Sequence, residues 1–101
     1  MKIWMQANVK WIPFEKGGRQ KLVPNNTRYC PIIVFPEAKT EDFWSAEILT
    51  NSITNDDEST IDISFLMPEA PFELLKPGAK FELYEGKKYV AAGIMVKEIN
   101  R

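Results

Sequence analysis

The residues that most often carry acid–base and metal chemistry are scarce in this chain of 101 residues. It has no histidine, which removes the commonest general base and the commonest metal ligand. The serines therefore have no imidazole to activate them. Cys30 is the single cysteine, so no internal disulfide can form, and we expect a reducing compartment and a structural or surface thiol. These absences predict a protein that binds rather than catalyses.

Carboxylates are the remaining candidates for chemistry. Asp56, Asp57 and Glu58 are consecutive in the sequence and could chelate a hard cation. They lack the fixed ligand spacing of a calcium loop, so we interpret Asn51–Thr60 as a solvated acidic loop instead. No sequence pattern places two carboxylates around a pocket, as a two-acid hydrolase requires. The sequence thus predicts no catalytic residues, no metal and no cofactor.

Positive side chains gather at two places in the sequence. One group surrounds the first loop and the other flanks the last turn, and the members are Lys16, Arg19, Lys21, Arg28, Lys87 and Lys88. If the fold brings these loops together, they form a basic face that could meet phosphates. The alternative is an ordinary solvated surface of mixed charge. The net charge of −1 gives no overall attraction to nucleic acid or to anionic membranes.

Short strands must position these residues, because no window shows the i, i+3, i+4 apolar spacing of a helix. The first strand has apolar residues at its odd positions, namely Ile3, Met5, Ala7, Val9 and Trp11. Trp4 lies on the otherwise polar face, either covered by a loop or exposed for a partner. Further strands are expected at residues 29–35, 43–49 and 61–65, separated by turns rich in glycine and proline.

The stretch from Phe81 to Ile99 predicts a hairpin that completes the sheet. Its first arm alternates apolar and polar residues, and Glu85-Gly86 supplies a tight turn. The return arm is apolar on both faces, with Val90, Ala92, Ile94 and Val96 on one and Tyr89, Ala91, Gly93 and Met95 on the other. Such a strand needs cover on both faces or a close neighbour. We therefore predict an all-β protein, a small closed antiparallel barrel of about six strands, as one domain over residues 1–101.

Three motifs, in this order, resemble the third, C-terminal barrel domain of bacterial elongation factor Tu. They are the loop Gly17-Gly18-Arg19, the strand Tyr29-x-Pro31 and the run Glu85-Gly86-x-Lys88-x-Val90-x-Ala92-Gly93. The resemblance spans nearly the whole chain and implies a six-stranded antiparallel barrel. The sequence has no G-x-x-x-x-G-K-[ST] loop, so GTP hydrolysis by the family's mechanism is not expected. The chain is then a free-standing relative of the barrel or a domain of something longer.

In the full factor, this domain contacts the backbone of aminoacyl-tRNA and also protein partners. The family's RNA-contacting positions fall here on Arg19, Gln20, Glu41, Glu85 and Gly86. Gln20 stands in place of a histidine, and Glu41 replaces a small hydroxyl residue with a negative charge. The arginine that precedes the Glu-Gly turn in the family is Tyr84 here. The last two differences favour a protein partner over phosphate.

We expect a non-catalytic binding module that recognises a protein through its loop face, at Arg19, Gln20, Glu41, Tyr84, Glu85, Gly86, Lys87 and Lys88. Trp4 and Tyr84 are the aromatic residues expected to be exposed. RNA binding through the same loops is one alternative. Another is an immunity-type regulator that mimics the translation factor and captures a toxin or effector. Neither a signal peptide nor a stretch long enough to span a bilayer is evident, so we expect a cytoplasmic protein.

Overall fold

The computed structural model describes residues 2–17, 28–38, 43–53 and 57–101. Six strands carry the fold: β1 (Trp4–Trp11), β2 (Ile32–Val34), β3 (Trp44–Ile53), β4 (Glu58–Phe65), β5 (Lys80–Glu85) and β6 (Lys88–Ile99). Two 3-10 helices of three residues, η1 (Phe14–Lys16) and η2 (Phe72–Leu74), are the helices in the described ranges. None of these is long and apolar enough to cross a membrane.

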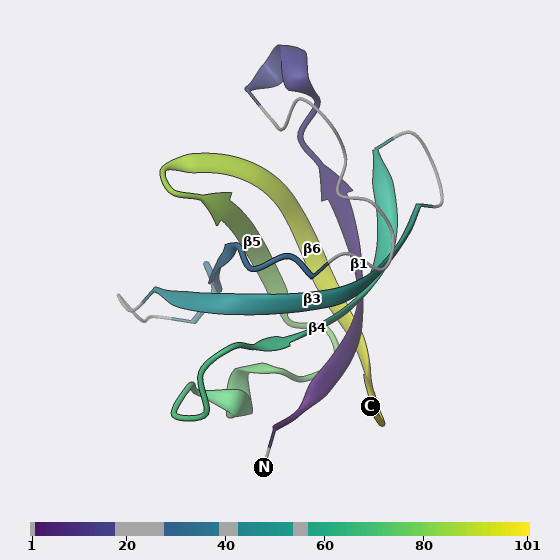
Figure 1. Ribbon diagram of the computed structural model, residues 1–101, viewed down its shortest axis with the longest axis vertical. Helices are drawn as coiled ribbons and strands as arrows, with labels where there is room; N and C mark the ends of the chain where they lie inside the picture. Colours follow the sequence, from purple (N-terminus) through teal and green to yellow (C-terminus); the bar gives the residue numbers. More distant parts are fainter. Residues whose placement is uncertain (1, 18–27, 39–42, 54–56) are drawn as a thin grey trace.

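The strands form a closed antiparallel barrel in the order β1-β4-β3-β2-β5-β6 (Figure 1). β1 pairs with β4 on one side and with β6 on the other, which joins the first strand to the last. Both termini lie at the same end of the barrel, and the β5–β6 hairpin projects at the upper left of Figure 1. The predicted all-β fold and the six-stranded closed barrel are confirmed.

Strand β1 faces the core as its alternating pattern predicts. Met5, Ala7, Val9 and Trp11 are buried, while Asn8 and Lys10 between them are exposed. Pro13 follows the strand and has no amide hydrogen to continue the ladder. The apolar residues that alternate in the sequence therefore face the core, and the polar residues between them face outward.

The predicted loop at Asn51–Thr60 is wrong at both of its ends, and residues 54–56 lie outside the described ranges. β3 continues to Ile53 and β4 begins at Glu58, and Ser52 pairs with Thr60 across this hairpin. Ser59 is buried and accepts a hydrogen bond from Trp11 Nε1 at 2.9 Å. The polar composition misled the sequence interpretation, because the two strands pair through their backbones, which polar side chains do not prevent.

The expected strand at residues 29–35 is shorter in the structure. β2 spans Ile32–Val34, and Tyr29 makes an isolated bridge to Ile48. Pro31 and Pro36 bound the strand because neither has an amide hydrogen for the ladder. Ile33 is buried, while Ile32 and Val34 point outward and are half-buried. The continuous apolar run thus has one face in the core and one on the surface.

The return arm of the last hairpin does not keep the faces that alternation predicts. Leu83 pairs with Ala91 and Tyr84 with Tyr89, so Val90 is an extra residue in a β-bulge. Val90 and Ala91 are consequently both buried, although the alternation placed them on opposite faces. Beyond the bulge Ile94 and Val96 point outward, each 40% exposed. Of the two expectations for this arm, cover on both faces does not hold at these two residues, and the close neighbour is found at Gly93.

Gly93 lies where two neighbouring strands approach closely, as expected. It pairs with Phe81 of β5 and with Val9 of β1. A Cβ atom at this position would lie 2.4 Å from the Phe81 ring and 2.8 Å from the Asn8 carbonyl oxygen. No side chain fits there without a shift of the barrel wall.

Candidate functional site

The eight residues predicted to bind a partner divide into two sets. Arg19, Gln20 and Glu41 lie outside the described residues. The other five, Tyr84, Glu85, Gly86, Lys87 and Lys88, are consecutive on the β5–β6 hairpin. The structure therefore describes only the hairpin residues of the predicted site, and the candidate site is defined around this hairpin.

The hairpin turn presents two cations to solvent. Gly86 has φ +62°, a left-handed conformation that a glycine adopts without steric cost. Lys87 and Lys88 follow it and are both exposed. Neither forms an ion pair with any residue in the described ranges. The turn therefore offers positive charge that a partner can reach.

Glu85, at the base of the hairpin, accepts a hydrogen bond from a residue of the Tyr29-x-Pro31 motif. The Tyr29 hydroxyl donates a hydrogen bond to Glu85 Oε2, and this bond is partly buried. The Tyr29 ring lies against Trp11, with 6.1 Å between ring centroids. This contact ties the base of the hairpin to the segment before β2 and to the core.

Tyr84 is half-buried rather than fully exposed, which corrects the sequence expectation. Its ring packs on Tyr89 across the hairpin, with centroids 5.4 Å apart. Its hydroxyl donates a hydrogen bond to Glu82 Oε1 at 3.0 Å. Burial raises the pKa of Tyr84, and the Glu82 carboxylate raises it further. Tyr84 thus stays neutral at physiological pH and presents an apolar ring beside the turn.

A groove of about 510 Å³ lies on the outer surface of β2 and β5 at the base of this turn. Its described lining consists of Ile32, Val34, Phe43, Tyr84, Gly86 and Lys87. Ile32 pairs with Tyr84 across the two strands, which sets these side chains next to one another. Apolar atoms dominate its walls, and Lys87 is the one charged residue among those that line it.

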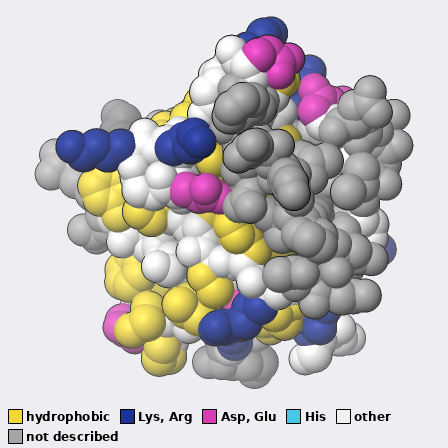
Figure 2. Space-filling model, turned by 45° about the horizontal axis from the view of Figure 1, so that its top comes forward, with side chains coloured by type: hydrophobic (Ala, Val, Ile, Leu, Met, Phe, Trp, Pro, Cys, Tyr) yellow, Lys and Arg dark blue, Asp and Glu magenta, His cyan; other side chains and the backbone are white. Residues whose placement is uncertain are grey.

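Phe43 is the functional candidate that the sequence interpretation missed. It is 74% exposed, more than any other large hydrophobic residue among those described. Trp44 beside it turns inward, where its ring meets Phe65 edge-on at 6.4 Å. The sequence did contain a signal for an exposed Phe43. Strand alternation that places Trp44, Ala46 and Ile48 on the inner face places Phe43 on the outer face. Hydrophobic side chains lie next to basic ones on the face shown in Figure 2.

Trp4, the other aromatic residue expected at the surface, is half-buried under two cations. Lys2 Nζ lies 5.0 Å from its ring centroid and Arg101 Cζ lies 5.5 Å from it. Such cation–π contacts cover the ring with long aliphatic chains. The termini rather than a loop therefore cover Trp4, and it presents less apolar surface than Phe43.

Arg28, which the sequence placed in a basic face, is paired instead. It donates a hydrogen bond to Glu47 Oε2 at 2.7 Å, and Lys2 forms an ion pair with the same carboxylate. Hydrogen bonds from Lys2 and Arg28 lower the pKa of Glu47, against the opposing effect of its burial. This cluster joins Glu47 of β3 to Lys2 before β1 and to Arg28 before β2, and the charge of Arg28, although exposed, is paired with a carboxylate.

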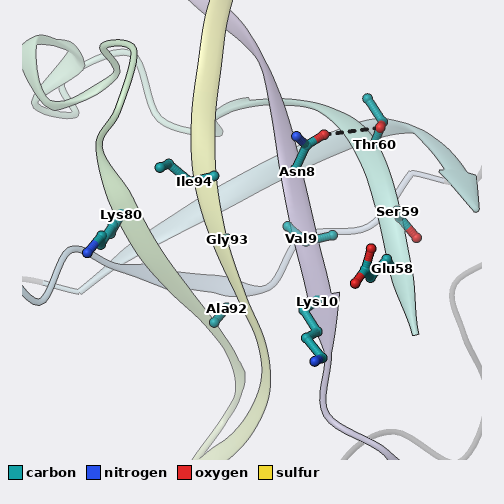
Figure 3. A pocket seen from close by; sticks show the side chains of 10 residues that line it. All are labelled: Asn8, Val9, Lys10, Glu58, Ser59, Thr60, Lys80, Ala92, Gly93 and Ile94. Carbon is teal, nitrogen blue, oxygen red and sulfur yellow. Dashed lines mark hydrogen bonds between the residues drawn. The ribbon is translucent and has the colours of Figure 1, made fainter. Parts of the chain in front are cut away.

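A second hollow of about 620 Å³ lies over β1, β4 and β6 (Figure 3). Ala92 and Gly93 form its floor, and Asn8 and Thr60 are joined there by a 3.1 Å hydrogen bond. Its lysines, Lys10 and Lys80, point away from this floor and away from each other (Figure 3). Polar groups that do not converge offer no defined ligand position, and none of the five predicted binding residues that the structure describes lines this hollow.

The acidic triplet is described only in part, because Asp56 lies outside the described ranges. Across the described ranges, no group of three or more potential ligands among His, Cys, Asp and Glu is arranged to hold a metal ion. Comparison with known protein families and with curated proteins found no match. The site is therefore interpreted from its own geometry.

Proposed function

We propose that this protein is a non-catalytic binding module that recognises a protein partner through the groove of β2 and β5. The exposed Phe43, set beside Ile32, Val34 and Tyr84, is the observation that carries this proposal. Large aromatic and aliphatic side chains around a concave surface are typical of the centres of protein interfaces. The groove also includes three of the residues that the sequence predicted for partner binding, namely Tyr84, Gly86 and Lys87.

The chemistry of the lining supports binding over catalysis. Among the described residues, Tyr84 and Lys87 are the titratable groups that line the groove, and the Tyr84 hydroxyl is directed to Glu82. General acid–base catalysis needs a donor and an acceptor that converge on one position. An apolar groove with a cation at its rim suits recognition instead.

The proposal includes descent from the third barrel domain of elongation factor Tu. A closed six-stranded antiparallel barrel is compatible with it. The Tyr29–Glu85 hydrogen bond also joins two of the motifs that carry the resemblance. These 101 residues contain no G-x-x-x-x-G-K-[ST] loop, so this barrel would keep the binding surface of that domain without nucleotide chemistry of its own.

RNA binding through the same hairpin is the second candidate function, favoured by the exposed Lys87 and Lys88. A phosphate-binding face would draw on several cations, and its affinity would fall steeply with salt. The described surface around the groove is mainly apolar, which favours a protein.

A capture experiment with matched variants separates the two functions. The immobilised protein is compared with Phe43→Ser, which alters the groove, and with Met67→Ser, which alters a 43% exposed residue elsewhere. We expect one protein to be captured by the unaltered chain and by Met67→Ser, to be lost with Phe43→Ser, and to persist after ribonuclease treatment. Capture of RNA, or capture that ribonuclease abolishes, would support the RNA function. Equal capture by all three chains would reject the groove.

A further inference from the structure

We propose that the groove of β2 and β5 takes an extended protein segment in which a large apolar side chain lies next to an acidic residue. This inference rests on the proposed protein-binding function and defines the chemistry of the partner. It follows from three properties of the groove's described lining: its apolar walls, its paired backbone and the position of Lys87, the one charged residue among the described residues that line it.

The walls require an apolar anchor. Ile32 and Val34 point outward from β2, and the ring of Tyr84 lies beside Ile32 on the next strand. Phe43 stands at the edge with 74% of its surface exposed to water. A hollow of about 510 Å³ with such walls gains most from a bulky apolar group that displaces water.

Most of the described backbone of the groove is already paired. β2 is paired with β5 along its whole length and with β3 at Ile32 and Ile33, and β5 is paired with β2 and β6. A partner therefore cannot add a strand across these residues, as it does at a free sheet edge. Recognition has to come from side chains inserted into the groove.

The charge at the rim favours an acidic neighbour for this anchor. Lys87 lines the groove, and Lys88 lies next to it at the turn. The two carboxylates of the same hairpin are directed to tyrosine hydroxyls, Glu82 to that of Tyr84 and Glu85 to that of Tyr29. A carboxylate in the partner meets the lysine ammonium groups, whereas a basic partner would place like charges together.

The test is a selection from a library of random peptides displayed on phage, carried out in parallel on four immobilised chains. These are the unaltered protein, Phe43→Ser, Lys87→Glu and Lys97→Gln. The last removes an exposed lysine of β6 that does not line the groove. The variants replace exposed side chains, and equal thermal midpoints verify that all four are folded.

The unaltered protein and Lys97→Gln are expected to enrich peptides with an aromatic or large aliphatic residue within a few positions of Asp or Glu. Lys87→Glu should retain the apolar preference and lose or reverse the acidic one. For the best peptide, Phe43→Ser is expected to weaken binding about 30-fold, the effect of losing a large aromatic contact residue. A fifth chain, Lys87→Gln, measured with this peptide alone, should bind it about two- to fivefold more weakly, as for the loss of an exposed ion pair.

Two failures can be told apart. If peptides enriched on the unaltered protein are neutral or basic and still depend on Phe43, the groove binds protein and the acidic partner is wrong. If no peptide is enriched, or if the same peptides are enriched on Phe43→Ser, the proposed function of the groove is wrong as well.

Discussion

The Tyr29 hydroxyl donates a hydrogen bond to the carboxylate of Glu85, across 56 positions of sequence. Tyr29 precedes β2 and Glu85 ends β5, so the bond holds the base of the last hairpin against the segment that enters the barrel. The groove of β2 and β5 lies beside this contact, since it is lined by Ile32 and by Tyr84, the neighbour of Glu85. The orientation of the hairpin therefore depends on a residue distant from the turn.

Replacing Tyr29 with Phe should destabilise the barrel by about 1–3 kcal/mol, because a partly buried carboxylate loses a hydrogen-bond donor. Denaturant unfolding measures the change. Glu85→Gln retains an acceptor and should cost less than Tyr29→Phe. A double variant whose effect equals the sum of the two single ones would show that these side chains do not interact in solution.

Replacing Gly93 with Ala should cost about 1–3 kcal/mol, because its Cβ would lie 2.4 Å from the Phe81 ring and 2.8 Å from a backbone oxygen. Gly86→Ala is the comparison, since among the described residues no atom beyond its chain neighbours lies within 4 Å of the added Cβ, and the cost there is about 1 kcal/mol of backbone strain. Thermal unfolding of both variants measures the two losses of stability. A Gly93→Ala protein as stable as the unaltered one would mean that β5, β6 and β1 are less closely packed.

Replacing Ser59 with Ala should destabilise the protein by about 1–3 kcal/mol, because the buried Trp11 Nε1 then has no acceptor. Ser52→Ala, on the exposed part of the same hairpin, should change stability by less than about 0.5 kcal/mol. Equal effects of the two substitutions would indicate that residues 51–60 form a loop after all.

Stability should fall on acidification in a way that depends on Glu47. Its pKa is lowered below the ordinary value of 4.5 by hydrogen bonds from Lys2 and Arg28. The folded state therefore binds this proton less readily than the unfolded state does. The stabilisation is present above pH 4.5 and is lost as the pH falls through the lower folded pKa.

Glu47→Gln should be less stable at neutral pH and should show a smaller decrease in acid. Glu69→Gln, which removes the charge of an exposed carboxylate, is the control. Denaturant midpoints between pH 3 and 7 provide the measurement. Parallel pH profiles for the unaltered chain and Glu47→Gln would contradict the ion-pair assignment.

Much of the barrel follows from local patterns in the sequence. The alternation in β1 places Met5 and Val9 in the core, because successive strand side chains point to opposite faces whatever the neighbours are. Gly86 predicts a turn because left-handed backbone is accessible to glycine at little cost. Even the close approach at Gly93 was expected, since a missing side chain in a strand indicates a near neighbour.

The tertiary structure decided which faces remain outside and which residues meet. The bulge at Val90 shifts the register of β6 against β5, so Ile94 and Val96 are exposed although alternation alone gave them a covered face. The groove joins Phe43 and Ile32 to Tyr84, from three separate parts of the chain. Strand periodicity is local, whereas register and barrel closure depend on pairing between distant strands. Sequence alone therefore determined the inward residues of β1, and closure of the barrel determined the surface that a partner would meet.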